Sequence, residues 1–562
     1  MGTSSEEQRV ITADAVSAVQ AGDLPPVGGF GTEQLTHDLL GGFGAVPPAV
    51  LVGEWFRLLR ELGKVALGIS DVEPAAGDRR FRDPAWTENA AARPVMQAYL
   101  AWAESLQRIA DAEPDWNRRE RLRFAFTALS DAMAPTNTLL GNPAAVKRAI
   151  ETGGRSLVRG TLNWLDDLLH NGGMPSQVDK EPFELGGNVA ASPGAVVFRN
   201  EMCELIQYMP TTERVHARPM LVIPPPVNKY YILDLAPGKS LIEHAVASGI
   251  QAFCISWYNP DPSEAHWGID EYVNCALQAI DAVCEITGSE DLTTFATCAG
   301  GILTSILLGH MAASNDRRVK AAGFGVMMLD MSCPTLMGVF ADERTVEATN
   351  QQVSRAGVIS GRDMAGFFTW LRPNDLVWNY WVNNYLMGND PPANDILFWN
   401  SDSTRLPARF HGQLMKLYLE NPLVEPGRLT VLGTPIDLEK VDCDVFAMGG
   451  TTDHIAPWKA CYEATRLFGG SSEFVLARAG HVQSLVSPPS YAKAGYFAGG
   501  DHQQTDADAW LASATEHKGS WWARWTDWLK ARSGEERTAS VKLGSRRHPP
   551  MDAAPGTYVL KP

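Results

Sequence analysis

The sequence predicts an α/β catalytic domain preceded by an α-helical domain. Two observations carry this prediction. From about residue 195 onward, short apolar runs typical of buried strands alternate with helical patterns, which is the order expected of a parallel α/β sheet. Between about residues 33 and 180, apolar residues recur at helical spacing without intervening strand patterns.

Length and charge narrow the class of protein. The chain has 562 residues, too many for one ordinary core, so we expect two domains or one large domain with an appended one. A net charge of −17 argues against non-specific nucleic-acid binding, which needs a basic face. The first residues lack the basic and apolar regions of a signal peptide, and no apolar run reaches the ~18 residues of a membrane span. We therefore expect a cytoplasmic protein without a membrane span.

The cysteines give no sign of a metal or redox site. All eight are scattered, and no C-x-x-C pair occurs. A long chain with so few cysteines is not typical of a disulfide-stapled fold. We expect no metal and no cofactor.

The N-terminal part divides into a tail and a helical domain. Residues 1–30 are polar and punctuated by Gly and Pro, so we expect them to be disordered. Residues 31–190 form the predicted α-helical domain, with apolar helical runs over 50–67, 95–109, 122–129 and 158–169. Nothing in this domain looks catalytic, and we expect its Trp and Leu side chains to pack on the core or on a partner.

Residues 191–562 form the predicted catalytic domain. Residues 196–198 and 204–208 alternate as a hairpin would, and further strands are expected over 218–223, 252–257, 292–297, 319–327, 445–450 and 473–476. Helices are expected between them, over 241–248, 269–286 and 457–468. The alternation stops over residues 330–435, a segment rich in aromatic residues. We interpret this segment as an insertion that forms a cap; a second small core is the alternative, and both can hold.

Cys298 lies at the junction on which the catalytic prediction depends. A β-prone run ends at Thr297, and helical spacing begins after Gly300 and Gly301. Strand, sharp turn and helix with a reactive residue at the turn is the geometry of a nucleophile elbow, normally written Gly-x-Ser-x-Gly. Small neighbours suit this turn because a large side chain would clash where the helix leaves the strand. A buried, inert cysteine is the alternative from this stretch alone.

Asp453 and His481 favour the catalytic interpretation. In an α/β-hydrolase, nucleophile, acid and histidine follow one another in the chain, and Cys298, Asp453 and His481 keep that order. Each lies just past a β-like run, where loops at the carboxyl edge of a parallel sheet carry chemistry. His454 competes as the base, but it adjoins Asp453 on one loop and cannot easily receive that carboxylate at Nδ1. We therefore predict an α/β-hydrolase core with Cys298, Asp453 and His481 as its triad.

The chemistry also requires two backbone donors for an oxyanion. A thiol needs a base to become a nucleophilic thiolate, a role that suits His481 oriented by Asp453. Ala299, the residue after the nucleophile, supplies one N–H. The second donor should come from the loop after Ile223, where Val227 is the first candidate because three prolines without an N–H precede it.

At these residues the chain resembles the polyhydroxyalkanoate synthases, most closely their single-subunit class I and II types. The family's box Gly-x-Cys-x-Gly-Gly is similar to Ala296-Thr297-Cys298-Ala299-Gly300-Gly301, with Ala in place of the first Gly. The acid and histidine motifs resemble Gly450-Thr451-Thr452-Asp453-His454-Ile455-Ala456-Pro457-Trp458 and Ala479-Gly480-His481-Val482-Gln483-Ser484. Further similarities lie within residues 81–86, 135–140, 225–235, 256–261 and 371–378, so the resemblance spans about residues 80–500.

The resemblance implies an acyltransferase that polymerises (R)-3-hydroxyacyl-CoA into a polyester and releases CoA. It implies a Cys-bound acyl thioester, a homodimer and a location at the surface of cytoplasmic polyester granules. The CoA thioester is then the substrate rather than a cofactor. A cysteine-nucleophile thioesterase or esterase of the same fold is the alternative, and a catalytically inactive granule-binding protein is a third possibility that three triad residues at three strand ends argue against.

Overall fold

The computed structural model describes residues 46–339, 341–502 and 506–562. The predicted disorder of residues 1–30 therefore lies outside the described residues. The chain forms two compact units. Among the described residues, the helical unit contains those up to Gln177 together with Asp363–Pro392, and the catalytic unit contains those of Val178–Arg362 and Ala393–Pro562. Within the described residues, no helix is both long and apolar enough to cross a membrane.

A ten-stranded mixed sheet forms the centre of the catalytic unit. Its strands follow the order β1-β2-β5-β4-β6-β7-β12-β13-β14-β15. The six strands from β5 to β13 are parallel, and the two outer strands on each side pair antiparallel with their neighbours. The predicted hairpin is confirmed as β1 and β2. The strands are β1 (Gly194–Arg199), β2 (Cys203–Tyr208), β4 (Met220–Ile223), β5 (Ala252–Trp257), β6 (Leu292–Thr297), β7 (Val319–Gly325), β12 (Asp444–Gly450), β13 (Ser472–Ala477), β14 (Gly495–Ala498) and β15 (Thr515–Lys518).

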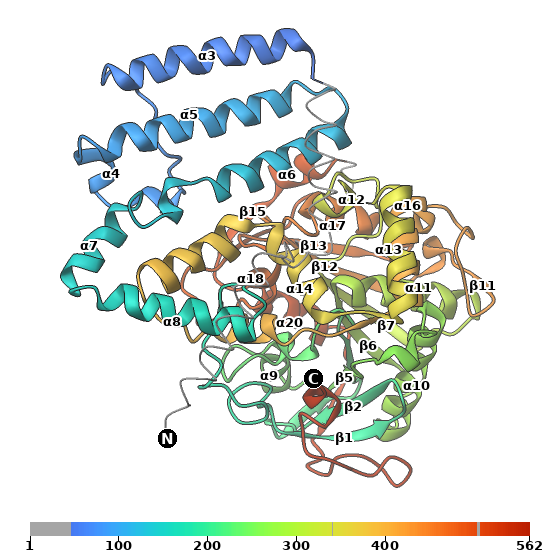
Figure 1. The fold of residues 1–562 in the computed structure, drawn as a ribbon. Coiled ribbons are helices and arrows are strands. Elements are labelled where there is room, and N and C mark those ends of the chain that lie inside the picture. The colour runs from blue at the N-terminus through green and yellow to red at the C-terminus, as the bar shows by residue number, and fades with distance from the viewer. Residues whose placement is uncertain (1–45, 340, 503–505) are drawn as a thin grey trace. The chain divides into compact units, whose positions relative to one another are not determined.

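Helices cover this sheet, as in an α/β-hydrolase. The helix α10 (Ile269–Thr287) packs against α11 (Cys298–Ala313), and α9 (Leu241–Ala247) packs against α20 (Trp522–Lys530), with strands lying between the two pairs (Figure 1). The central strands are buried on both faces, which explains why their sequences are continuous apolar runs rather than alternating ones.

The tryptophans near the C-terminus belong to the core of this unit. Trp521, Trp522 and Trp525 are almost fully buried, and Trp525 packs against Phe295 of β6 with ring centroids 5.0 Å apart. These side chains therefore stabilise the sheet by removing large apolar surfaces from water.

The helical unit begins with a layer of antiparallel helices. Its helices are α3 (Pro48–Ala66), α4 (Ala85–Glu88), α5 (Ala92–Asp111), α6 (Trp116–Ala132), α7 (Pro143–Glu151) and α8 (Arg155–His170). The four long helical runs seen in the sequence correspond to α3, α5, α6 and α8. Asp115 caps α6 by accepting the Arg118 N–H, and Asn142 followed by Pro143 starts α7, so familiar start signals fix these boundaries.

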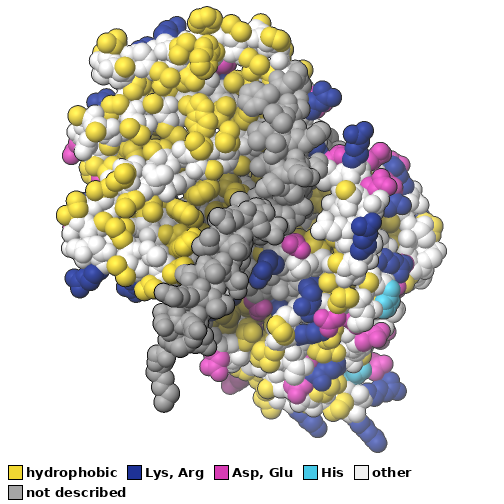
Figure 2. Space-filling view, in the orientation of Figure 1, with side chains coloured by type: hydrophobic (Ala, Val, Ile, Leu, Met, Phe, Trp, Pro, Cys, Tyr) yellow, Lys and Arg dark blue, Asp and Glu magenta, His cyan; other side chains and the backbone are white. Residues whose placement is uncertain are grey.

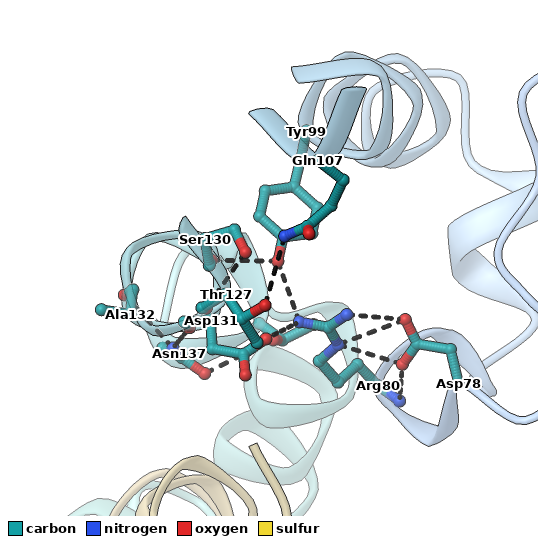
Figure 3. A network of polar contacts seen from close by, with 10 residues as sticks. Asp78, Arg80, Tyr99, Gln107, Thr127, Ser130, Asp131, Ala132 and Asn137 are labelled. Atoms are coloured by element: carbon teal, nitrogen blue, oxygen red, sulfur yellow. Dashed lines mark hydrogen bonds and ion pairs between the residues drawn. The ribbon is translucent and has the colours of Figure 1, made fainter. Parts of the chain in front are cut away.

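A buried polar network joins distant parts of the helical unit (Figure 3). The Arg80 guanidinium donates to Asp78, to the Tyr99 hydroxyl at 2.8 Å and to Asp131 at 3.0 Å. The Asn137 amide donates to the Asp131 carbonyl at 2.7 Å. Burial raises the pKa of the Asp131 carboxyl to about 6, although Arg80 opposes that shift. The sequence motifs at 81–86 and 135–140 thus flank structural hydrogen bonds.

The predicted insertion at 330–435 is divided between the two units. Its middle part, Asp363–Pro392, groups with the helices of the N-terminal part. This segment lies in close backbone contact with α8. A Cβ added to Gly160 of α8 would lie only 1.9 Å from the Tyr385 carbonyl oxygen. The Tyr385 hydroxyl also donates to the Asp167 carboxylate at 2.7 Å, and the Asn384 amide donates to the Ser176 carbonyl at 2.7 Å. The sequence predicted a domain boundary between residues 190 and 191. In the structure, the boundary between the two units lies between residues 177 and 178.

The flanking parts of the insertion remain with the catalytic unit. They contain α13 (Glu343–Ala356), α15 (Asp395–Ser401) and α16 (Ala408–Glu420), and a short antiparallel pair, β8 (Val358–Ile359) with β9 (Leu406–Pro407), connects them.

Candidate active site

Cys298 stands at a strained elbow between β6 and α11. Its φ angle is +48°, a left-handed conformation that costs a residue with a Cβ of the order of 1–2 kcal/mol. The following turn is tightly packed, because an added Cβ on Gly300 would lie 2.5 Å from the Ile223 carbonyl oxygen and 2.7 Å from the Pro224 carbonyl carbon. A side chain at position 300 would therefore force the helix start and the loop after β4 apart. The substitution of Ala for Gly at position 296 is accommodated, since Ala296 lies fully buried between Ile223 and Phe324.

The structure brings Asp453 and His481 together. Asp453 follows β12, and its Oδ2 lies 2.7 Å from Nδ1 of His481, which follows β13. Its Oδ1 accepts the N–H groups of Ile455 and Ala456, both at 2.9 Å. The Asp453 side chain is fully buried and the His481 side chain is 11% exposed, so water screens this pair weakly.

Two loops and a short helix hold this pair in place. Thr451 donates its N–H to the Ala477 carbonyl at 2.8 Å, and Thr452 donates to Ala479 at 3.1 Å, so the acid loop and the histidine loop are joined directly. His481 begins the helix α18 (His481–Leu485). The indole N–H of Trp521 donates to the Ser484 carbonyl at 2.8 Å, which fixes that helix from the core side.

The charges around His481 favour its protonated form. Burial, the largest single cause, lowers the pKa of the imidazole, and the Asp453 charge and hydrogen bond oppose it. A hydrogen bond with Cys298 acts in the same direction, and together these interactions raise the pKa of His481 to about 10. The imidazole lies next to the thiol, and these surroundings stabilise the imidazolium that forms when the ring takes the thiol proton.

Two other ionisable residues of the catalytic unit, Asp444 and His244, have partners of their own. Asp444 is at the opposite end of β12, where its carboxylate pairs with Arg532 at 2.7 Å. His244 lies on α9 and is 3.0 Å from the Thr526 hydroxyl. Asp453 pairs with His481, as the sequence argument predicted.

The two predicted backbone donors lie on neighbouring elements. Ala299 is in the first turn of α11, where N–H groups have no acceptor within the helix. Val227 lies in the loop after β4, and β4 pairs with β6 so that Ile223 is opposite Ala296. That loop therefore leaves the same sheet edge as the elbow, next to Cys298.

Sequence reasoning missed residues of the insertion that support this site. Tyr418 of α16 lies close enough to Cys298 that the thiolate charge, after burial, raises the pKa of the phenol. The Thr404 hydroxyl contacts the Pro226 and Val227 carbonyls, and the Trp399 indole N–H donates to the Lys229 carbonyl at 2.7 Å. A motif carries no signal for such contacts, because they join segments about 170 residues apart.

Comparison with known proteins decides the family. The sequence model described as "Poly-beta-hydroxybutyrate polymerase (PhaC) N-terminus" matches residues 77–245, and that of the "alpha/beta hydrolase fold" matches residues 232–488. "Poly(3-hydroxyalkanoate) polymerase 1" of Ectopseudomonas oleovorans is 49% identical over 500 residues, covering 89% of each chain. The chain belongs to the poly(3-hydroxyalkanoate) polymerase family.

Other members of the polymerase family cover the same length. "Poly(3-hydroxyalkanoate) polymerase 2" of Ectopseudomonas oleovorans is 47% identical over 502 residues, covering 89% of each chain. "Poly(3-hydroxyalkanoate) polymerase subunit PhaC" of Cupriavidus necator is 40% identical over 503 residues, covering 88% of this chain and 85% of that relative. The family resemblance and the fold class predicted from sequence are confirmed, and the thioesterase alternative is not favoured because these relatives are named as polymerases.

Proposed function

We propose that this chain polymerises (R)-3-hydroxyacyl-CoA into polyester through a thioester on Cys298. The observation that carries the proposal is the Asp453–His481 pair next to the elbow thiol, in a chain with 40–49% identity to named polymerases. The CoA thioester is the substrate, and no separate cofactor is needed. An anionic substrate approaches against a net charge of −17, so its binding requires local positive groups.

In the first step, His481 takes the proton of the Cys298 thiol. The thiolate attacks the thioester carbonyl, and the bond from that carbon to the CoA sulfur breaks. The CoA thiolate receives the proton from the imidazolium and leaves as CoA. The raised pKa of His481 supports proton uptake, and Asp453 holds the ring with Nε2 available for the thiol.

In the second step, the 3-hydroxyl group of an acyl chain attacks the Cys298 thioester. His481, alone or together with Asp453, removes the hydroxyl proton, the carbon–sulfur bond breaks and the Cys298 thiol is regenerated. The product is an oxoester. A thioester is the more activated of the two esters, so this transfer is downhill without ATP, and a serine nucleophile would lose that advantage.

Both steps pass through an oxyanion, which we assign to the N–H groups of Ala299 and Val227. Preorganised donors of this kind each contribute about 10²–10³-fold to turnover. Water must be kept from the acyl-enzyme, or the enzyme becomes a thioesterase. The aromatic insertion is the expected barrier, and Tyr418 on its α16 helix lies near Cys298, so this part of the insertion must move to admit CoA.

The fate of (R)-3-hydroxybutyryl-CoA tests this proposal. We expect CoA release together with insoluble polymer in wild type, and loss of both in Cys298→Ala and His481→Gln. CoA release with free hydroxy acid as the only product would assign the thioesterase alternative. Full CoA release by Cys298→Ala would refute the nucleophile, and an unimpaired His481→Gln variant alongside an inactive Cys298→Ala variant would refute the base.

We also propose that the helical unit contacts the polyester surface of a cytoplasmic granule, with the enzyme as a homodimer. Two helices of this unit expose apolar stripes, and Figure 2 shows hydrophobic side chains gathered over the unit. The α8 stripe is entirely exposed, while α8 buries its small and polar face. The exposed residues are Val52, Trp55, Phe56 and Leu59 on α3, and Val158, Leu162, Leu165 and Leu169 on α8. An uncharged, water-insoluble polyester matches such stripes, which a soluble protein seldom leaves uncovered.

Replacement of the four α8 residues by Gln tests this surface. We expect the variant to lose sedimentation with a suspension of amorphous poly(3-hydroxybutyrate) while it remains a dimer by light scattering. A control variant, Thr161→Gln with Asp166→Gln, changes exposed polar positions of the same helix. Retained sedimentation would overturn the assignment, and loss of the dimer with retained sedimentation would assign the stripe to a second copy of the chain.

A further inference from the structure

The loop after β4 is held through its carbonyl groups. The Trp257 indole N–H donates to the Pro224 carbonyl at 2.8 Å, and the Thr404 hydroxyl lies 3.0 Å from the Pro226 oxygen and 2.6 Å from the Val227 oxygen. Thr404 is 5% exposed. A loop whose oxygens are fixed by side chains has fixed peptide planes, so its N–H groups have fixed directions as well.

The Pro226 carbonyl and the Val227 N–H belong to the same peptide unit. In a trans peptide, the C=O and N–H bonds point in opposite directions across a rigid plane. The single proton of the Thr404 hydroxyl is shared between the Val227 oxygen at 2.6 Å and the Pro226 oxygen at 3.0 Å, so both oxygens are drawn to one side and the Val227 N–H is turned to the other side. A flip of this plane would replace the Val227 donor with a carbonyl oxygen, which would repel an oxyanion rather than stabilise it.

The end of the same loop is fixed by a buried cation. The Lys229 side chain is 2% exposed, and its Nζ donates to the carbonyls of Val559 at 2.7 Å and Lys561 at 2.5 Å. The nearest carboxylate oxygen in an ion pair, on Asp402, is 3.8 Å away. Burial lowers the pKa of Lys229, which reflects the cost of keeping an ammonium group in this place.

The acceptors of Lys229 are themselves anchored. The buried Glu204 carboxylate accepts the N–H groups of Thr557 at 2.9 Å and Tyr558 at 3.0 Å. Lys561 then pairs with Asp261 at 2.6 Å. We call residues 557–561 the C-terminal strap. The strap gives Lys229 two immobile oxygens, so the loop is clamped on both sides of Val227.

We propose that Thr404 is a positioning residue of the oxyanion hole, which sets the direction of the Val227 N–H, and that Lys229 and the C-terminal strap lock the loop in that state. The inference rests on the proposed function only in that Cys298 attacks an acyl thioester. Neither residue needs to touch the substrate. Thr404 belongs to the part of the insertion that groups with the catalytic unit, so the insertion contributes to transition-state stabilisation and not only to a cap.

The test compares Thr404→Val with Thr404→Ser. Val keeps the shape of Thr and removes the hydroxyl, whereas Ser keeps the hydroxyl. We expect Thr404→Val to lower kcat for CoA release about 100-fold, the cost of losing one oxyanion donor, with little change in KM. We expect Thr404→Ser to restore most of the rate. Lys229→Met should show the same pattern as Thr404→Val.

Alkylation of Cys298 by iodoacetamide distinguishes a loss of oxyanion-hole positioning from a general disruption of the active site. This displacement at a saturated carbon forms no oxyanion, so peptide-resolved mass spectrometry should give wild-type rates in Thr404→Val. The proposal would be overturned if Thr404→Val kept turnover within threefold of wild type, or if Thr404→Val and Thr404→Ser lost equal turnover. It would also be overturned if the alkylation rate of Cys298 in Thr404→Val fell as far as its turnover. CoA release is the readout, so a wild type that forms hydroxy acid instead of polymer refutes the polymerase while leaving this test valid.

Discussion

The substitution Gly300→Ala should push the elbow at Cys298 away from the loop after β4, which contains the proposed oxyanion donor Val227. The added Cβ would lie 2.5 Å from the Ile223 carbonyl oxygen and 2.8 Å from the Pro224 oxygen, and both are backbone atoms that no rotamer change can move. Ordinary contact begins at 3.4 Å, so the helix start and the loop must separate by 3.4 − 2.5 = 0.9 Å. A misplacement of about 1 Å at reacting groups costs about 10²-fold in rate. We therefore expect about a 100-fold loss of kcat.

The effect on stability should be small by comparison. Overpacking costs about 1–3 kcal/mol, and the higher helix propensity of Ala offsets about 1 kcal/mol of it. CoA release with (R)-3-hydroxybutyryl-CoA measures kcat, and urea unfolding measures stability. Gly309→Ala is the matched control, because its Cβ would meet the Ile436 side chain at 2.7 Å on the same helix, away from Cys298. If Gly300→Ala keeps kcat within threefold of wild type, or if Gly309→Ala loses as much, the geometric argument is wrong.

Three further predictions concern the charge and the access of the site. The folded-state pKa of His481 is raised to about 10 from an ordinary value near 6.5, so its proton stabilises the fold fully below about pH 6.5 and this contribution is lost as pH rises through about 10. The thermal midpoint of wild type should thus fall more steeply over that range than that of His481→Gln, and parallel curves would contradict the shift. Asp453→Asn should lower CoA release about 10³- to 10⁴-fold with an unchanged fold by circular dichroism, and a loss below tenfold would refute its role. Tyr418→Ala should raise the ratio of free hydroxy acid to polymer because water gains access to Cys298, whereas Leu419→Ala, at the partly exposed next position, should not.

The parallel core and the hydrogen-bonded acid and histidine could be predicted because their signals are local. Continuous apolar runs mark strands buried on both faces, and the residue that follows each strand lies at the active edge whatever the rest of the chain does. Asp453 and His481 could be paired from their places after consecutive strands, without knowledge of the loops that join them. The small residues around Cys298 indicated a close approach of backbone but left a buried, inert cysteine as the alternative, and the order of Asp453 and His481 favoured the elbow.

The division of the insertion could not be predicted in the same way. Residues 363–392 look aromatic and apolar, which is equally typical of a cap and of a second core. Their place in the helical unit depends on single contacts, such as the fit of Gly160 against Tyr385 and the Tyr385–Asp167 hydrogen bond. Such contacts join residues more than 200 positions apart and leave no periodic pattern.

The sequence also could not predict that the apolar side chains of α8 are exposed. The run from Val158 to Leu169 has the spacing of a helix that packs on a core, yet these side chains are exposed. The opposite face of α8 holds Ser156, Gly160 and Asp167, which pack tightly because small residues allow close backbone approach. An apolar stripe on a helix usually predicts that the stripe is buried. When the opposite face, made of small and polar residues, is the buried one, the exposed stripe indicates a binding surface.

The most direct test of the central claim is capture of the acyl-enzyme. Wild-type protein is mixed with (R)-3-hydroxybutyryl-CoA, quenched in acid within the first turnovers, and digested for mass spectrometry. We predict a hydroxybutyryl group on the Cys298 peptide that hydroxylamine removes, together with soluble CoA in at least equal amount, and no such group in Cys298→Ala. An acyl group on another residue, or CoA release by Cys298→Ala at the wild-type rate, would contradict the account.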